Sequence, residues 1–435
     1  VDYHGPAGWG YRRFILHYAH LCAVAGGVDA FLIGSEMVGL TTIRGAEGSY
    51  PAVAALVQLA ADVRAILGPE VKISYAADWS EYFGHHPGGG ELRYHLDPLW
   101  ADENVDFVGI DNYMPLSDWR DGEDHLDAQA WRDVRDPAYL MANVEGGEGY
   151  DWYYANDEHR AAQNRTPIED GAHDEPWVWR YKDLRNWWGR LHYERIGGTR
   201  AEEPTGWEPA SKPIWFTEIG CAALDRGTNQ PNKFLDALSS ESRLPWWSHG
   251  VRDDAMQQAY LTALTRYWAD PARNPQGEYD GPMIDMGRAH VWAWDARPFP
   301  AFPSRTDLWS DGPAWGRGHW LNGRAAAVPL ADLVAEICRE SGVGAVDVSG
   351  LFGQVRGFVL TGAETARAAL QQLFLAYGFD AVEREGILRF RMRGGRVDRV
   401  IPDAVLAMGE GLAGAEFQRA AEAELSGRLR LNHID

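Results

Sequence analysis

The stretch KPIWFTEIG, residues 212–220, contains a short run of large apolar residues that ends at an acidic one, Glu218. The run FLIGSE, residues 31–36, has the same form and ends at Glu36. Strands that are apolar throughout are typical of parallel sheets, because both faces of such a sheet are covered. We therefore predict two buried parallel strands, each with a glutamate at its C-terminal end.

Three further apolar runs repeat this pattern and also lead into polar or aromatic residues. Helical patterns separate the runs, and alternation of this kind predicts a parallel sheet with helices outside it. The active site of a (β/α)₈ barrel is built at the C-terminal ends of its strands. The predicted fold class is therefore α/β, a (β/α)₈ TIM barrel. The further strands are 71–76, 106–112 and 290–294, and the helices are 11–25, 51–67, 92–100, 177–193 and 253–268.

The number of predicted strands is five, which is fewer than a closed barrel of eight needs. If the five are strands 4 to 8, the first three lie upstream of Val1. Alternatively, the sheet is open. The chain begins with Val rather than Met, shows no signal-peptide pattern, and is interpreted as a fragment of a longer protein.

Tryptophan marks a domain boundary. All 20 tryptophans lie at or before Trp320, and the sequence beyond is aliphatic and rich in alanine. Proline and glycine punctuate residues 300–325. We predict a barrel domain over 1–310 and an incomplete, small α+β domain over 325–435. Its predicted elements are helices at 329–341 and 364–377, strands at 346–348 and 355–360, and a hairpin of 379–382 with 387–392.

Composition limits the partners. The formal net charge of −22 disfavours nucleic acid, whose phosphates need a basic surface, whereas neutral sugars are indifferent to charge. No apolar run has the length of a membrane span. The three cysteines lack CxxC spacing and are predicted to be reduced thiols, and His85 and His86 lack the spacing of a zinc motif. We expect no metal and no cofactor.

Residues 117–175 form a long acidic insertion that contains three tryptophans. It is either a solvated loop excursion or a wall of a substrate cleft, since long loops at the rim of a barrel often carry specificity. Both interpretations stay open at this point.

Paired carboxylates suggest the chemistry. Glycoside hydrolysis needs one carboxyl that protonates the leaving oxygen and a second that attacks or stabilises the anomeric carbon. Glu36 and Glu218, if they close strands 4 and 7, would face each other across the barrel mouth. Their proximity would push their pKa values apart and leave one acid and one anion.

Four runs together resemble a known group of enzymes. FLIGSE (31–36), VDFVGIDNYMPL (105–116), KPIWFTEIG (212–220) and VWAWD (291–295) resemble the strand-4, strand-6, strand-7 and strand-8 signatures of the clan of retaining (β/α)₈ glycoside hydrolases. Nearly the whole chain resembles the glycoside hydrolase TIM-barrel-like tail protein of gene transfer agents and related phages. In that family a phage-tail domain follows the barrel, as residues from about 325 onward would here.

The resemblance implies roles for individual residues. It makes Glu36 the general acid/base and Glu218 the nucleophile, with Tyr113 hydrogen-bonded beside Glu218. A flat indole matches the apolar face of a sugar ring, and strand alternation allows only one of the two strand-8 tryptophans to face the lumen. The substrate-binding residues implied are Ser35, Asp78, Asn112, Trp292 and Trp294.

One position departs from the clan. Asn usually precedes the acid/base and holds the sugar 2-hydroxyl, but this chain has Ser35. The change raises three possibilities: a 2-acetamido sugar, a slower enzyme, or a barrel that binds glycan without cleaving it.

The expected function is that of a tail- or baseplate-associated hydrolase that acts on cell-envelope polysaccharide during DNA delivery. Other tail and baseplate proteins would be its partners, in a particle assembled in the bacterial cytoplasm and acting at the host cell surface. The alternative is a catalytically inactive, glycan-binding or structural module of the tail tip. A free metabolic glycosidase would explain the barrel but not the second domain.

Overall fold

The computed structural model describes residues 8–323, 327–360, 365–394 and 399–402. The chain divides into two compact units, Val1–Ala325 and Ala326–Asp435. Each unit has its own hydrophobic core. No helix in the described ranges is both long and apolar enough to cross a bilayer. Cys22, Cys221 and Cys338 are free thiols.

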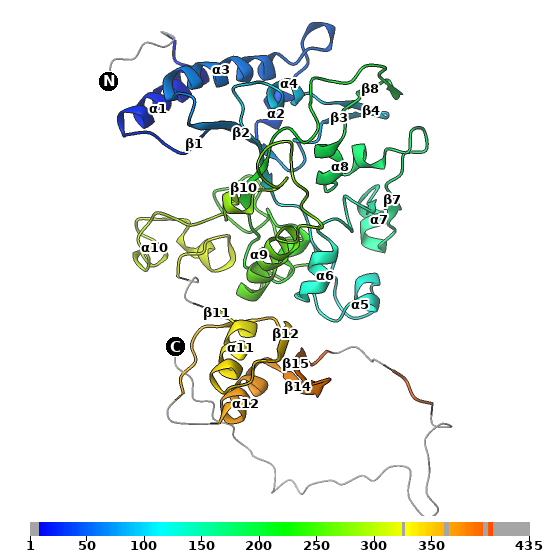
Figure 1. The fold of residues 1–435 in the computed structure, drawn as a ribbon, viewed down its shortest axis with the longest axis vertical. Coiled ribbons are helices and arrows are strands. Elements are labelled where there is room, and N and C mark those ends of the chain that lie inside the picture. The colour runs from blue at the N-terminus through cyan, green and yellow to red at the C-terminus, as the bar shows by residue number, and fades with distance from the viewer. Residues whose placement is uncertain (1–7, 324–326, 361–364, 395–398, 403–435) are drawn as a thin grey trace, which may run out of the picture. The chain divides into compact units, whose positions relative to one another are not determined.

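A parallel sheet organises the first unit (Figure 1). Its strands are hydrogen-bonded in the order β1-β2-β5-β10. Single parallel bridges then pair Ile284 and Val291 with β10. A mixed α/β fold with a parallel sheet is thus confirmed, but the described strands do not close into a barrel. The sheet strands are β1 (Ala30–Ser35), β2 (Lys72–Asp78), β5 (Val108–Asn112) and β10 (Ile214–Ile219).

The inner strands β2 and β5 are apolar because protein covers both of their faces. All five residues of β5 are buried, and so are five of the seven in β2. Gly109 in β5 allows close approach of the neighbouring strand, since a Cβ there would lie 2.4 Å from the carbonyl oxygen of Tyr75. The fifth predicted strand, 290–294, is wrong as a strand: only the bridge at Val291 forms.

Three long helices match the predicted patterns. α3 (Pro51–Leu67) begins with proline in its first turn and ends at Gly68, which has a φ of +84°. It packs against α1 (Tyr11–Val24) and against the sheet (Figure 1). α9 (Asp254–Trp268) begins where the side chain of Asp253 accepts a hydrogen bond from Met256 N. The buried face of α3 consists of Val53, Leu56, Leu59, Ala60 and Val63.

Two predicted helices are largely wrong. Residues 177–193 hold only a 3-10 turn, η2 (Pro176–Trp179), and a short helix, α8 (Leu184–Gly189). The chain breaks there because the Asp183 side chain caps a new helix at Asn186 N, and because His192 lies between stacked rings rather than on a helix face. Residues 92–100 likewise divide into β4 (Glu91–Arg93) and α4 (Asp97–Trp100).

Short elements complete the first unit. A second sheet has the order β3-β4-β8-β9 and is antiparallel. The remaining short elements outside the acidic insertion are α2 (Val38–Thr41), η1 (Ala46–Gly48), β3 (His85–Gly88), β8 (Arg195–Ile196), β9 (Thr199–Arg200), η3 (Gly227–Asn229), η4 (Met286–Arg288), α10 (Ala301–Ser304) and η5 (Gly312–Arg317).

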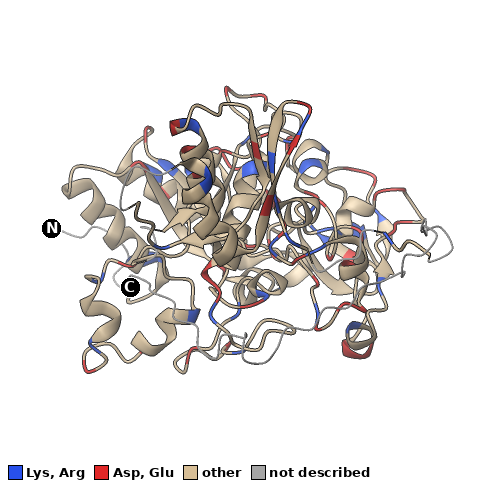
Figure 2. Cartoon of the chain, turned by 90° about the horizontal axis from the view of Figure 1, so that it is seen from below, with Lys and Arg blue, Asp and Glu red and all other residues tan. Residues whose placement is uncertain are grey.

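The acidic insertion is held together by ion pairs. Arg165 donates to Asp118 over 3.0 Å and also pairs with Asp127. Asp118 is buried, so part of the acidic excess lies inside the insertion rather than in solvent. Figure 2 shows basic positions scattered among the acidic ones over helices, strands and loops. The elements of the acidic insertion are α5 (Leu126–Ala130), α6 (Pro137–Ala142), β6 (Trp152–Tyr153), α7 (Asp157–Ala162) and β7 (Thr166–Pro167).

The second unit is a small α+β fold. Its main sheet has the order β12-β15-β14, with β14 and β15 as an antiparallel hairpin. Of the predicted strand 355–360, only Val355 lies in a strand. The elements are β11 (Val328–Pro329), α11 (Leu330–Glu340), β12 (Val346–Gly350), β13 (Gln354–Val355), α12 (Ala366–Tyr377), β14 (Phe379–Arg384) and β15 (Ile387–Met392).

Candidate active site

Irregular strand ends position the two predicted carboxylates. The register of β1 against β2 shifts between Leu32 and Ser35, and that of β10 against β5 shifts between Phe216 and Glu218. Such bulges redirect side chains and are frequent beside active sites. Glu36, directly after β1, has a φ of +51°. A left-handed backbone at a residue other than glycine costs about 1–3 kcal/mol and is concentrated at functional sites.

Three carboxylates meet at these strand ends. One oxygen from each of Glu36, Asp111 and Glu218 lies within 4.8 Å of the others. Sequence reasoning missed Asp111 as a site residue. The signal was present, since Asp111 stands at the end of an apolar strand as the two glutamates do.

Asp111 links the two strands that carry the glutamates. Its Oδ2 accepts a hydrogen bond of 3.0 Å from the hydroxyl of Ser35, and its Oδ1 accepts one of 2.7 Å from the hydroxyl of Thr217. These donors directly precede Glu36 and Glu218 in sequence. The buried Asp111 therefore fixes the ends of β1 and β10 relative to each other.

Tyr113 contacts Glu218 directly. Its phenol donates a hydrogen bond of 2.6 Å to Oε2 of Glu218. Burial and the nearby Glu218 charge raise the pKa of Tyr113 well above its usual range, so the phenol keeps its proton. Burial and Asp111 raise the pKa of Glu218 to about 7, against the opposing effect of the Tyr113 hydrogen bond.

Glu36 holds its proton more strongly than Glu218 does. The Glu36 residue is exposed to solvent in the cavity. Protein around its carboxyl nevertheless desolvates the charged form, which raises the pKa of Glu36 to about 8. The charges of Asp111, Asp78 and Glu218 add to this rise. At neutral pH the pair therefore consists of a protonated Glu36 and a partly ionised Glu218.

One cavity of about 640 Å³ contains both glutamates. Of the other predicted residues, Asp78, Tyr113 and Trp292 line it as well. Burial raises the pKa of Asp78. Sequence reasoning missed the other lining residues, because most of them lie in loops whose sequences show no helical or strand periodicity. These residues are Val38, Trp79, Ser80, Asn232, Lys233, Phe234, Glu241 and His319.

Two family models match the chain. The model of the GTA TIM-barrel-like domain, where GTA stands for gene transfer agent, matches residues 9–303. This chain belongs to the GTA TIM-barrel-like domain family. The model of a putative phage tail protein matches residues 365–435, of which 395–398 and 403–435 lie outside the described residues. A tail-associated protein of gene transfer agents with a TIM-barrel-like domain is thus confirmed.

One solved structure is similar to part of the chain. It is a chain of the virion of a native gene transfer agent (GTA) particle, 50% identical, with a TM-score of 0.25. The match covers 32% of this chain and 33% of that one, so it spans about a third of that relative's length. No curated protein matches.

Three predicted residues of the TIM-barrel-like domain lie outside the cavity lining. The Ser35 hydroxyl is turned to Asp111. Asn112 is buried, and its Oδ1 accepts a hydrogen bond of 3.1 Å from Met114 N. Trp294 is 66% exposed and does not line the cavity, whereas Trp292 does.

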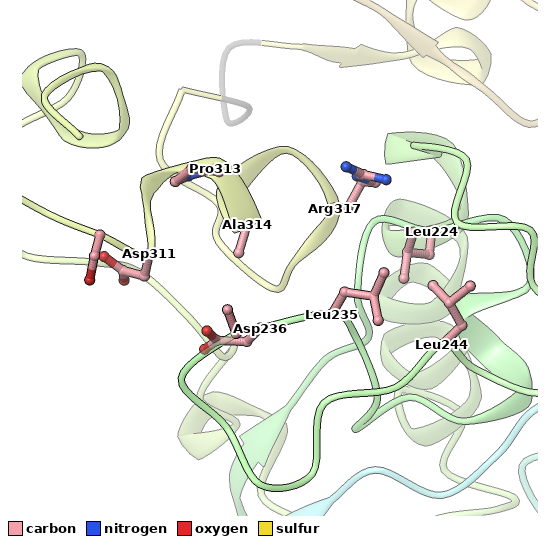
Figure 3. Close-up of a pocket in the computed structure, with 10 residues that line it drawn as sticks. Leu224, Leu235, Asp236, Leu244, Asp311, Pro313, Ala314 and Arg317 are labelled. Carbon is pink, nitrogen blue, oxygen red and sulfur yellow. The ribbon is translucent and has the colours of Figure 1, made fainter.

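Another hollow of the domain, of about 290 Å³, contains none of the predicted residues. Figure 3 shows Leu224, Leu235 and Leu244 along one part of it, with Arg317 nearby, and Asp236 and Asp311 at the other end. Asp311 is ion-paired with Arg297 over 2.8 Å, so the two aspartates of this hollow are not a free pair of carboxylates.

The three carboxylates are also the group that could hold a cation, because oxygen ligands suit hard divalent ions. However, Asp111 already accepts two hydroxyl hydrogen bonds and Glu218 accepts one from a phenol. The hydroxyl and phenol donors that hold Asp111 and Glu218 in place also suit a site for proton transfer.

Proposed function

We propose that the TIM-barrel-like domain is a retaining glycoside hydrolase, with Glu36 as general acid/base and Glu218 as nucleophile. One observation carries the proposal: oxygens of the two glutamates lie within 4.8 Å of each other in one cavity. Carboxyl groups of retaining enzymes are about 5–5.5 Å apart, whereas inverting enzymes leave about 6.5–9.5 Å for a water molecule.

Each residue has a defined step in this mechanism. Glu218 attacks the anomeric carbon while Glu36 gives its proton to the leaving oxygen, so that the glycosidic bond breaks and a glycosyl ester forms on Glu218. Glu36, now a carboxylate, takes a proton from water, and that water releases the sugar from Glu218. Tyr113 stabilises the Glu218 anion before attack and after release, which its 2.6 Å hydrogen bond supports.

The substrate that we propose is a cell-envelope polysaccharide. Trp292 offers an aromatic face in the cavity, and the net charge of −22 favours a neutral chain over an acidic one. The matches to tail and particle proteins support a place in the particle tail, beside other tail and baseplate proteins. The hydrolase would then act at the host cell surface during DNA delivery, after assembly in the cytoplasm.

A second candidate function is a binding or structural module that has lost catalysis. Ser35 favours it, because its hydroxyl is occupied by Asp111 and replaces the Asn that holds the sugar 2-hydroxyl in the clan. The raised pKa of Glu218 also favours it, since a nucleophile must be ionised.

Release of reducing ends from purified envelope polysaccharides tests the two candidates. Hydrolysis requires product from the parent and a loss of about a hundred- to ten-thousandfold in Glu36→Gln and Glu218→Gln. Glu158→Gln, an exposed residue on α7, is the matched control and should retain full activity. Glycan binding without release by any folded variant would favour the binding module.

A further inference from the structure

A separate cavity of about 450 Å³ lies in the first unit, at the acidic insertion. Three aromatic residues line it: Tyr153 from β6, and Trp179 and Tyr181 from the segment that follows the insertion. Ile168, Glu169 and Gly149 also line it. Its size falls in the range of small-molecule sites, about 300–1,000 Å³.

The aromatic lining is built by the local fold. Tyr153 pairs with Thr166 in the β6–β7 hairpin and is 46% exposed. Its neighbour Trp152 stacks on the guanidinium of Arg165, 4.1 Å from the ring centre. Because side chains alternate along a strand, Trp152 anchors the hairpin while Tyr153 is left to line the cavity.

Gly149 allows the second ring to take its position. A Cβ at Gly149 would lie 1.9 Å from Cζ of Tyr181, and the backbone φ of +82° disfavours other residues there. The Tyr181 ring therefore lies directly on the backbone of the insertion. Any side chain at residue 149 would push this ring out of the lining.

An aromatic contact connects this cavity with the carboxylate cavity. The rings of Trp79 and Tyr181 meet edge to face, with centres 4.8 Å apart. Trp79 lines the cavity of Glu36 and Glu218, and Tyr181 lines the other. Nε1 of Trp79 is buried and has no hydrogen-bond partner among the described residues. The two cavities thus share one aromatic wall.

We propose that the cavity of Tyr153, Trp179 and Tyr181 is a second sugar-binding subsite, which holds a further unit of the polysaccharide bound at Glu36 and Glu218. The subsite rests on the proposed function, and it makes the domain specific for extended polysaccharide chains. Flat aromatic rings match the apolar face of a sugar ring, and the exposed Glu169 carboxylate accepts hydrogen bonds from sugar hydroxyls. The acidic insertion would accordingly form a wall of the substrate cleft.

Binding of defined oligosaccharides to the full chain tests the subsite. Isothermal titration would use β-1,4-linked disaccharides and hexasaccharides of N-acetylglucosamine and of mannose, in a Glu218→Gln background that prevents turnover. We expect Tyr153→Ala to weaken binding of a hexasaccharide about five- to tenfold and to leave disaccharide binding unchanged. Tyr153→Phe keeps the ring and should bind as the parent does. Tyr18→Ala, at a tyrosine of similar exposure (48%) on α1, is the matched control.

Equal affinities of the parent and Tyr153→Ala for both hexasaccharides would overturn the subsite, and so would absence of binding in both series. An equal loss for disaccharides and hexasaccharides would also overturn it, because the cavity would then not be a separate subsite. Release of reducing ends by the parent and its loss in Glu218→Gln are compared in two proteins that both keep Tyr153, so that comparison tests the hydrolase alone. Failure of the subsite is therefore distinguishable from failure of the hydrolase.

Discussion

The phenol of Tyr113 donates a hydrogen bond of 2.6 Å to Oε2 of Glu218, across 105 residues of sequence. The two side chains meet because β5 and β10 are adjacent and parallel, so that their C-terminal ends lie at the same edge of the sheet. Because burial and the Glu218 charge raise the pKa of Tyr113, the phenol keeps its proton and is the donor in this hydrogen bond. The contact therefore favours the ionised carboxylate, which opposes the effects of burial and of Asp111.

Removal of this donor should slow hydrolysis. A hydrogen bond to a charged group contributes about 1.5–3 kcal/mol, so Tyr113→Phe should lower kcat/KM about 10- to 100-fold. Steady-state kinetics on the cleaved polysaccharide would measure the change. Tyr267→Phe removes a phenol that donates to Glu145 outside the cavity and is the control. Unchanged kinetics in Tyr113→Phe would show that the contact is only structural.

The pH profile of kcat/KM should be a narrow bell. Activity requires ionised Glu218 and protonated Glu36, so it should fall below about pH 7 and above about pH 8. Asp111→Asn removes a negative charge that raises both pKa values, and it should shift both limbs to lower pH. The rates of the two proteins from pH 4 to 10 give the comparison. If the pH profile of kcat/KM is the same in Asp111→Asn as in the parent, the charge of Asp111 does not influence the two glutamates.

The raised pKa of Glu36 predicts a stability cost at high pH. A carboxyl whose pKa is higher in the folded than in the unfolded chain stabilises the fold below the unfolded pKa, near 4.5. That stabilisation is lost as the pH rises toward about 8. Glu36→Gln stays neutral, so its melting temperature should exceed that of the parent at pH 9 and equal it at pH 4. The same difference in melting temperature between Glu36→Gln and the parent at pH 4 and at pH 9 would argue against a raised pKa of Glu36.

The sequence predicted four sheet strands because each is a local apolar run with a polar residue at its end. Burial on both faces requires such runs in the inner strands β2 and β5. The run at 290–294 has the same composition, yet only Val291 pairs with a strand. A strand forms only where a neighbouring strand is in place to hydrogen-bond with it, and the composition of the run does not specify that neighbour. The aromatic helix predicted at 177–193 failed for a related reason, since its rings pack around His192 instead of along one helix face.

The site was predictable where it follows strand ends. Glu36, Tyr113 and Glu218 lie together in the cavity, and each stands at or just after the end of a predicted strand. Lys233 and Glu241 were not predictable, because they come from a loop without periodicity and meet through an ion pair. Asp111 begins a run of three residues, Asp111-Asn112-Tyr113, that follows the apolar residues of this strand, and sequence position alone does not show which of the three faces the site.

The two strand-8 tryptophans should differ in their effect on binding. Trp292 lines the cavity and is 49% exposed, whereas Trp294 is 66% exposed and lies outside the lining. Trp292→Ala should raise KM about tenfold through loss of an aromatic face, and Trp294→Ala should change it less than twofold. Kinetics of both variants on one polysaccharide make the comparison. Equal effects would mean that neither indole has a specific place against the sugar.

The anomeric configuration of the first product, followed by proton NMR, tests the roles of Glu36 and Glu218 most directly. Because oxygens of the two glutamates lie within 4.8 Å of each other, we predict that the parent releases sugar with the configuration of the bond that it cleaves, and that Glu218→Gln releases none. Release of the opposite anomer, equal release by Glu218→Gln, or no release from any envelope polysaccharide by the folded parent would contradict a retaining hydrolase.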